Sequence, residues 1–374
     1  MTLVLSIGLF LYLVTLLWLI KGFFKLQGFR PKKTAPKTRF TILIPFRNEA
    51  KNIPQLLGSL SALDYPKDLY EVIFINDASE DNGEALLNAS KREVKFSFQL
   101  LQNNRVSKSP KKDALAIGLD RAKYDWIITT DADCIFPKKW LHYYNQCIGE
   151  TRPKMICGPI GYRNGVSVLG QFQVLDGFSL QLVAMGSFGW KAPLLNNGAN
   201  LAYHKDAFHE VEGYKGNDHI ASGDDVFLLE KMLKAFPDEI QFLKYPDAEV
   251  TTDSESKWSN AIQQRVRWAS KITEQKNPWV KRIGGVVFIA NLLFLVSLLG
   301  FIFFPRSGAI YISFMFSKFA LDVVVLTLMA SFFKKRMPIF HSLASILVYP
   351  FITMIVVFKG LNGSYTWKGR THSK

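Results

Sequence analysis

Cysteine is scarce in this chain of 374 residues and occurs only at Cys134, Cys147 and Cys157. The three residues form no Cys-x-x-Cys pair, so the sequence lacks the spacing of a zinc site and the even count of a disulfide framework. So few cysteines are typical of a reduced, cytoplasmic domain.

Acidic residues are fewer than basic ones. The chain has 31 Asp and Glu residues and 46 Lys and Arg residues, which gives a formal net charge of +15. The sequence contains no nucleic-acid recognition module, which argues against a nucleic-acid partner. It also contains no P-loop or kinase motif, which disfavours a nucleotidyltransferase or a lipid kinase. We interpret the excess charge as Lys and Arg that face the cytoplasm and anionic lipid.

Hydrophobic residues make up 48% of the chain and concentrate at its two ends. Residues 3–20 carry no charge and are long enough to span a bilayer. Positive charge follows this run and none precedes it, which disfavours a signal peptide. We therefore predict an N-terminal transmembrane helix over residues 1–22, with the N-terminus outside and the following domain in the cytoplasm.

The C-terminal region, residues 284–358, predicts two or three further spans. Residues 284–304 and 308–333 are apolar candidates, and 337–358 is a third that Pro350 interrupts. Lys318 and Asp322 share one helix face in the second span, as a structural pair or as part of a substrate passage. Three spans would leave a basic tail outside, so either the last segment is re-entrant or those charges are tolerated.

Residues 38–275 predict one α/β domain. Apolar strands at 40–45, 70–75, 96–101 and 126–130 alternate with helical stretches at 49–60, 83–91 and 111–122. This alternation favours a Rossmann-like, mostly parallel sheet covered by helices on both faces. The domain ends in an amphipathic helix over 257–276, which we expect at the membrane interface.

Carboxylates follow two of the predicted strands. Asp131 and Asp133 come after an apolar strand, where an open α/β sheet places its ligands. Two such carboxylates suit Mg²⁺ or Mn²⁺ bound to a diphosphate, with a turn or cap as the alternative. Asp77 ends the second strand and could accept hydrogen bonds from a nucleotide, or form an Asx turn. Lys111 begins a helix and either contacts phosphate or lies in a solvated basic face.

Two further motifs lie downstream. Asp224 and Asp225 open a helix, where one carboxylate could cap it and Asp225 could act as a general base. Gln264, Arg267 and Trp268 fall on one helix face, with Arg suited to phosphate and Trp to a sugar or base. An interfacial helix with snorkelling arginine is the alternative there.

As an ordered set, these motifs resemble those of the membrane-bound family 2 glycosyltransferases, which include cellulose, chitin and hyaluronan synthases and ceramide glucosyltransferase. The likeness covers roughly residues 38–275. It implies a GT-A fold, a divalent metal, a nucleotide-sugar donor and inversion at the anomeric carbon. Asn76 stands where the family usually has the first aspartate of a pair, and the low span count differs from that of polymer-threading synthases.

The resemblance also assigns residues. It places Pro45, Arg47 and Glu49 beside the nucleotide, Asp77 on the base, and Asp131 and Asp133 on the metal and diphosphate. Asp225 matches the general base, next to Asp224. Gln264, Arg267 and Trp268 match the segment that clamps the diphosphate and acceptor side.

We therefore expect a multi-pass enzyme of the inner membrane that moves a hexose or an N-acetylhexosamine from UDP to a lipid, a lipid-linked sugar or a growing glycan. A processive polysaccharide synthase is the first alternative. A catalytically inactive nucleotide-binding membrane protein is the more distant one.

Overall fold

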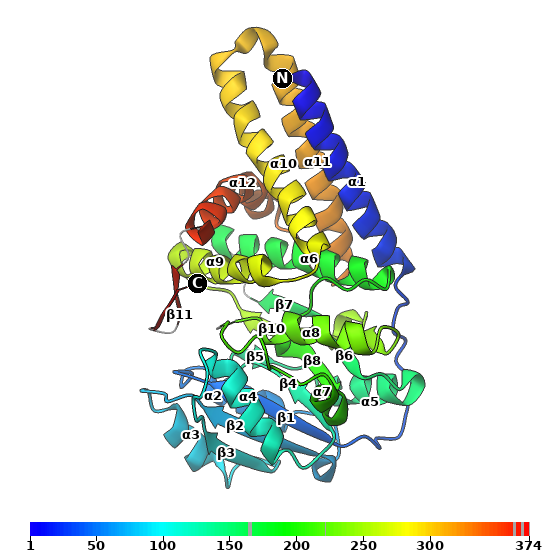
Figure 1. The fold of residues 1–374 in the computed structure, drawn as a ribbon, viewed down its shortest axis with the longest axis vertical. Coiled ribbons are helices and arrows are strands. Elements are labelled where there is room, and N and C mark those ends of the chain that lie inside the picture. The colour runs from blue at the N-terminus through cyan, green and yellow to red at the C-terminus, as the bar shows by residue number, and fades with distance from the viewer. Residues whose placement is uncertain (164–166, 221, 362–363, 368–369, 374) are drawn as a thin grey trace. The chain divides into compact units, whose positions relative to one another are not determined.

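The computed structural model describes residues 1–163, 167–220, 222–361, 364–367 and 370–373. The chain forms two compact units, each built from segments far apart in the sequence (Figure 1). The first unit, which we call the helical unit, contains Met1–Leu26, Tyr162–Leu194 and Ser254–Lys374. The second, the sheet unit, contains Gln27–Gly161 and Leu195–Asp253.

A seven-stranded sheet forms the centre of the sheet unit, in the order β3-β2-β1-β4-β8-β6-β9. Its strands are β1 (Phe40–Phe46), β2 (Tyr70–Asn76), β3 (Phe98–Gln102), β4 (Trp126–Thr129), β6 (Met155–Cys157), β8 (Leu201–His204) and β9 (Ile240–Phe242). The pairs among β3, β2, β1 and β4 are parallel, whereas β8 is antiparallel to both of its neighbours. The expected mostly parallel sheet is thus confirmed, with one reversed strand.

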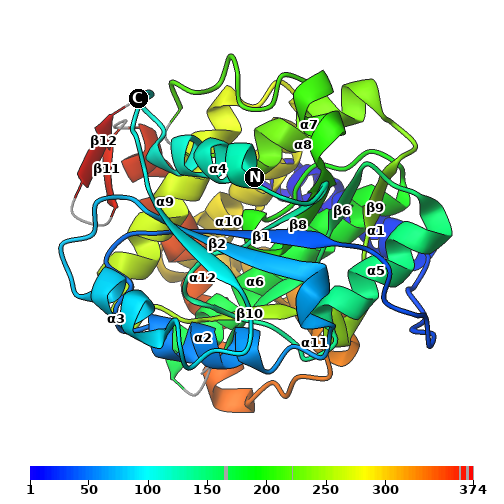
Figure 2. The same ribbon diagram turned by 90° about the horizontal axis from the view of Figure 1, so that it is seen from below.

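Helices cover both faces of this sheet (Figure 2). Because successive side chains of a strand point to opposite faces, β1 directs Ile42 and Ile44 to one side and Leu43 to the other. The first side packs in one core with α2 (Ile53–Ser61) and α3 (Gly83–Ser90). On the other side, α4 (Pro110–Arg121) lies so close that a Cβ on Gly118 would contact Leu43 at 3.0 Å.

The remaining elements of the sheet unit are short. They are β5 (Cys134–Ile135), α5 (Trp140–Thr151), α7 (Lys205–Glu210), α8 (Asp224–Ala235) and β10 (Val250–Asp253). β10 pairs antiparallel with β5. The strand β7 (Ile160–Arg163) contains one of the points where the chain passes from one unit to the other.

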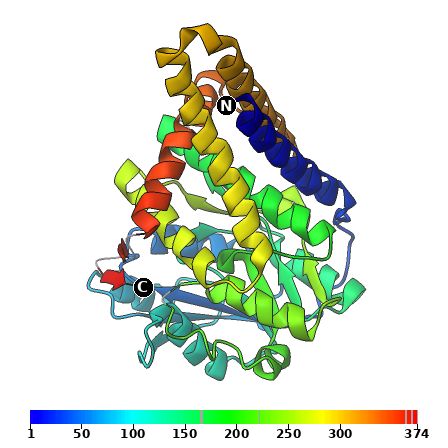
Figure 3. The same cartoon turned by 45° about the horizontal axis from the view of Figure 1, so that its top comes forward.

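The helical unit holds every helix of the described chain that is long and apolar enough to cross a membrane. These are α1 (Thr2–Lys25), α10 (Pro278–Phe303), α11 (Gly308–Phe332) and α12 (Ile339–Leu361). In Figures 1 and 3, α1, α10 and α11 run side by side. The unit also contains α6 (Val168–Gly189), α9 (Trp258–Glu274) and the hairpin β11 (Ser364–Trp367) and β12 (Arg370–Ser373).

Pro350 does not interrupt the last apolar segment, which forms one continuous helix. The prediction of an interruption was therefore wrong. Proline removes one backbone hydrogen bond, and apolar helices tolerate this loss when neighbouring helices pack around the kink. Such neighbours are present, because α12 packs against α6, α9 and α10.

Glycines bring α1 and α6 into backbone contact within the helical unit. A Cβ on Gly22 would collide with the carbonyl oxygen of Gly186, and one on Gly189 would collide with that of Gly22. Beside this crossing, the rings of Trp18 and Trp190 stack with centroids 6.0 Å apart. Small residues are the usual means by which apolar helices approach so closely.

Candidate active site

The polar residues predicted between β1 and α8 gather at one edge of the sheet. Parallel strands bring their carboxyl ends to the same edge, so β1, β2 and β4 present their last residues together. The first turns of α4 and α8 add Lys111, Asp224 and Asp225. The sheet unit therefore has one cluster of charged side chains at its carboxyl edge.

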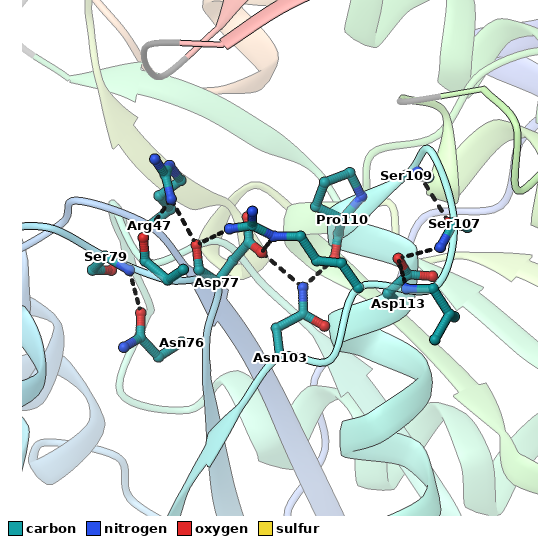
Figure 4. Close-up of polar contacts among 12 residues, drawn as sticks. Arg47, Asn76, Asp77, Ser79, Asn103, Ser107, Ser109, Pro110 and Asp113 are labelled. Carbon is teal, nitrogen blue, oxygen red and sulfur yellow. Dashed lines mark hydrogen bonds and ion pairs between the residues drawn. The ribbon is translucent and has the colours of Figure 1, made fainter.

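Asp77 is buried at the end of β2 and is held by donors from neighbouring loops (Figure 4). Its Oδ1 accepts hydrogen bonds from Arg105 Nε at 2.6 Å and Asn103 Nδ2 at 2.8 Å. Arg47, just after β1, donates to the backbone oxygen of Asp77 at 3.0 Å. A nucleotide that contacts Asp77 would therefore meet a carboxylate already fixed in orientation.

The sequence left open an Asx turn formed by the Asp77 side chain. In the structure, the side chain that closes a local turn here is that of Asn76. Its Oδ1 accepts from the backbone N of Ser79 at 2.9 Å, and its Nδ2 donates to Glu84 at 2.6 Å. An aspartate at this position could not donate to Glu84, because a carboxylate only accepts. The hydrogen bond to Glu84 therefore depends on the amide of Asn76.

Pro45, Arg47 and Glu49 occupy the end of β1 and the turn after it. Pro45 lies opposite Ile75 in the parallel register. Arg47 forms an ion pair with Glu80 at 2.7 Å. The helix predicted from residue 49 begins instead at Ile53, because Asn48 has a left-handed φ of 53° and the Glu49 carbonyl closes a turn first.

Lys111 joins two of the predicted acidic motifs. Its ammonium lies 2.8 Å from Asp131 and 3.2 Å from Asp224. Burial lowers the pKa of Lys111, but the carboxylates of Asp131, Asp224 and Asp225 outweigh it and hold the pKa above its ordinary value. Lys111 thus stays charged at any physiological pH.

Asp225 is oriented by backbone N–H groups. Its Oδ2 accepts from Gly198 at 3.2 Å, and its Oδ1 accepts from Val226 at 2.8 Å. Thr129 fixes the same segment by donating to the Gly198 carbonyl at 2.7 Å. The residue that caps α8 is Gly223, so neither aspartate serves as its N-cap. Asp225 therefore satisfies a first-turn N–H of α8 through Val226, and its other oxygen is held by Gly198.

Asp131 and Asp133 lie on the turn directly after β4. The described residues contain no cluster of three or more His, Cys, Asp or Glu side chains placed to hold a metal. Mg²⁺ is commonly held by one or two carboxylates together with substrate phosphates, and this pair supplies such hard oxygens. The Lys111 ammonium beside Asp131 shows that this carboxylate pairs with positive charge. The residues present therefore fit a divalent metal that binds together with a diphosphate.

The motif with Gln264, Arg267 and Trp268 lies in the helical unit, on α9. All three side chains are partly buried. Gln264 Oε1 accepts a hydrogen bond from Tyr162 at 3.1 Å. The guanidinium of Arg265 lies 5.4 Å from the centroid of the Trp268 ring.

Sequence reasoning missed several residues that hold the predicted ones in place. They are Asn103, Arg105, Tyr162, Asp176 and Arg265. For Asn103 and Arg105 a signal was present, because they follow β3 at the same sheet edge as Asp77. For Tyr162 and Asp176 the sequence offered none, since their contacts join segments about a hundred residues apart.

Comparison with known proteins places most of the chain in one family. Residues 41–208 match the family model for glycosyl transferase family 2, and residues 126–334, more than half of the chain, match that for glycosyl transferase family group 2. The poly-β-1,6-N-acetyl-D-glucosamine synthase of Staphylococcus aureus (strain COL) is 34% identical over 142 residues, 37% of this chain and 33% of that protein. The synthase of the same name from Staphylococcus epidermidis is 28% identical over 236 residues, 61% of this chain and 53% of that protein. The matches thus span between a third and about half of these relatives.

A solved structure shares the whole fold. The mannosyltransferase PcManGT from Pyrobaculum calidifontis, in complex with GDP-Man and Mn²⁺, superposes with a TM-score of 0.59 at 15% identity. The match covers 96% of this chain and 99% of that one. This likeness confirms the expected GT-A fold.

Proposed function

Because the chain belongs to the family 2 glycosyltransferases, we propose that it transfers a sugar from a UDP-sugar to an acceptor hydroxyl with inversion at the anomeric carbon. The observation that carries this proposal is the Lys111 bridge between Asp131 and Asp224. It puts the residues proposed for the leaving diphosphate next to those proposed for the acceptor. A single displacement needs both at once.

The acceptor side of the reaction is assigned to Asp225. Its carboxylate takes the proton from the acceptor hydroxyl as the oxygen forms a bond to the anomeric carbon. The bond from that carbon to the diphosphate oxygen breaks, and the electron pair leaves with the diphosphate. The backbone N–H groups of Gly198 and Val226 fix the carboxylate for this task.

The donor side is assigned to Asp131, Asp133 and Lys111. Asp131 and Asp133 would hold Mg²⁺ or Mn²⁺, which supplies charge neutralisation for the diphosphate when bound. Lys111 places a permanent positive charge beside the same oxygens. Pro45, Arg47, Glu49 and Asp77 are assigned to the nucleotide.

UDP-N-acetylglucosamine is the donor to test first, because the matched relatives are named poly-β-1,6-N-acetyl-D-glucosamine synthases. The acceptor is a lipid, a lipid-linked sugar or a growing glycan. The same relatives favour a second candidate function, processive synthesis of a polysaccharide. The length of the product on a sizing gel distinguishes single addition from processive synthesis.

The apolar helices support a place in the cell membrane. We propose that the sheet unit lies in the cytoplasm. A cytoplasmic sheet unit agrees with the three free, buried cysteines in it. It also gives the site access to nucleotide-sugars.

The proposal is tested by incubating membranes that contain the protein with a panel of nucleotide-sugars and Mg²⁺ or Mn²⁺. We expect release of UDP from one donor, its loss with EDTA, and its return when metal is restored. Asp225→Asn and Asp133→Ala should abolish release. Asp120→Asn makes a matched charge change at an exposed position of α4 and should leave release unchanged. No release from any donor and no binding of UDP would contradict the proposal and favour a non-catalytic protein.

A further inference from the structure

The C-terminal end of α1 carries two lysines on one helix face. Lys21 and Lys25 are four residues apart, so their side chains leave the helix on the same side. Both are exposed, and their ammonium groups lie 5.7 Å and 4.6 Å from the centroid of the Trp190 ring. Cation–π attraction to one ring therefore holds two like charges beside each other.

Trp190 is itself fixed in place, directly after α6 and where α6 packs against α1 (Figure 1). Its Nε1 donates to the carbonyl oxygen of Trp18 at 2.9 Å, and the two indole rings stack at an angle of 9°. The next residue, Lys191, is exposed and adds a third positive charge at this helix end. We call Lys21, Lys25 and Lys191 the lysine cluster.

The sequence segments that form the lysine cluster contain almost no carboxylates. The chain has no Asp or Glu before Glu49 and none between Asp176 and Asp206. Asp176 is already paired with Arg265, whose terminal nitrogen lies 2.9 Å from its carboxylate. The segments around the cluster therefore supply positive charge and no acidic residue to balance it.

The C-terminal end of α11 adds basic residues beside α1. The ring of Phe332 packs edge-on against that of Phe23, with centroids 5.4 Å apart. Residues 334–336, which follow directly, are Lys-Lys-Arg, and no Asp or Glu occurs between Asp322 and the C-terminus. The ends of α1, α6 and α11 thus share one sign of charge, and an anionic ligand would offset it.

Exposed apolar side chains continue the same face of α1 away from the lysines. Val14, Leu17, Lys21 and Phe24 recur at spacings of three and four residues, so they lie along one side of the helix. Val14 is 46% exposed, Leu17 54% and Phe24 67%. A ligand along this face would meet positive charge at one end and hydrocarbon along the rest. That pattern fits a lipid, since a free phosphate ion gains nothing from exposed hydrocarbon.

We propose that the lysine cluster binds the phosphate of an anionic phospholipid, whose acyl chains lie along Val14 and Leu17 of α1. The phosphodiester offers anionic oxygens to Lys21 and Lys25 and so relieves the repulsion between the two ammonium groups. The stacked indoles of Trp18 and Trp190 lie at the headgroup level, where tryptophan is enriched in membrane proteins. A zwitterionic lipid brings its own cation to the same place, so the cluster selects a headgroup with net negative charge. All the residues involved belong to the helical unit, and the inference does not depend on the proposed function.

Native mass spectrometry of the full chain in detergent measures lipid binding directly. Dioleoyl phosphatidylglycerol and dioleoyl phosphatidylcholine share their acyl chains and differ in net charge. We expect the wild type to retain phosphatidylglycerol at about a tenfold lower lipid concentration, and K21Q/K25Q to lose this preference. Inorganic phosphate should not displace bound phosphatidylglycerol, because it lacks the acyl chains that contact α1.

K91Q/K95Q is the matched control, because it also removes two exposed lysines four residues apart, in the sheet unit. It should keep the wild-type preference, and K21R/K25R, which keeps both charges, should keep most of it. Lys25→Gln alone is the milder change should the double variant not fold, and it should lose part of the preference. Equal binding of the two lipids to the wild type, or a full preference in K21Q/K25Q or Lys25→Gln, would overturn the inference. Displacement by inorganic phosphate would also overturn it, since the cluster would then bind anions without regard to lipid.

Discussion

The ammonium group of Lys111 lies 2.8 Å from a carboxylate oxygen of Asp131, at the turn where we propose that metal and diphosphate bind. Lys111 also contacts Asp224, so its removal takes one positive charge away from two buried or half-buried carboxylates. We predict that Lys111→Met lowers kcat/KM for the donor by about 100-fold, the usual cost of losing one charge-stabilising group. Steady-state UDP release measures this effect. Lys108→Met, at an exposed lysine just before α4, should have no effect.

Gly198 leaves no room for a side chain between the acidic motifs. A Cβ there would lie 2.8 Å from Asp224 Oδ2 and 3.6 Å from Lys111 Nζ. The backbone φ of Gly198 is one that alanine adopts, so Gly198→Ala tests crowding and not backbone strain. We expect Gly198→Ala to lower UDP release by about tenfold through displacement of these charges. Gly58→Ala, whose added Cβ meets nothing within 4 Å, is the control, and equal activity of the two variants would refute this reading.

The buried ion pair between Lys318 and Asp322 gives a prediction about the membrane helices. Lys318 Nζ lies 2.6 Å from Asp322 and 2.9 Å from Asn291 Oδ1, and Tyr12 donates to Asp322 at 2.7 Å. These contacts join α1, α10 and α11. A structural pair predicts that Lys318→Met alone destabilises the protein by about 3 kcal/mol, because it leaves a buried charge. The double variant K318M/D322L should recover most of that loss.

Thermal stability in detergent and UDP release in membranes separate the two roles that the sequence left open for this pair. If the double variant recovers both its thermal stability and its UDP release, the pair has a structural role. A double variant that is stable but inactive would instead support a role in substrate passage.

The cysteines supply a test of folding for all these variants. Burial raises the pKa of Cys147 to about 11, and it raises the pKa of Cys134 and Cys157 as well. At pH 8 only about one Cys147 thiol in a thousand is therefore ionised, and the thiolate is the form that reacts. We predict that iodoacetamide at pH 8 leaves the native protein unmodified, by intact mass, and labels all three cysteines after denaturation. Rapid labelling of the native wild type would contradict the buried positions.

The sequence predicted those features that depend on local pattern. Apolar strands followed by Asp77 and by Asp131 located the carboxyl edge of the sheet, because parallel strands must end together. The reversed direction of β8 was not predictable, since strand direction depends on pairing and not on the residues of Leu201–His204 themselves. Likewise, the start of α2 depends on the left-handed backbone of Asn48, for which sequence gives only a weak preference.

Within the candidate site, the motif residues were predictable and their partners were not. Lys111 was considered as a phosphate contact, but its bridge to Asp224 requires α4 and α8 to meet in space. Arg265 lies inside the recognised motif, yet its partner Asp176 is 89 residues away in the sequence. Long-range partners of this kind follow from the tertiary structure alone.

The glycine crossing of α1 and α6 means that the first helix is not an interchangeable anchor. Gly22 meets Gly186 and Gly189 backbone to backbone, so α1 fits α6 by shape as well as by hydrophobicity. Exchanging α1 for another apolar segment of equal length would keep the attachment to lipid and lose the fit. An N-terminal helix grafted from a different membrane protein should therefore work only if it carries glycine at the position of Gly22.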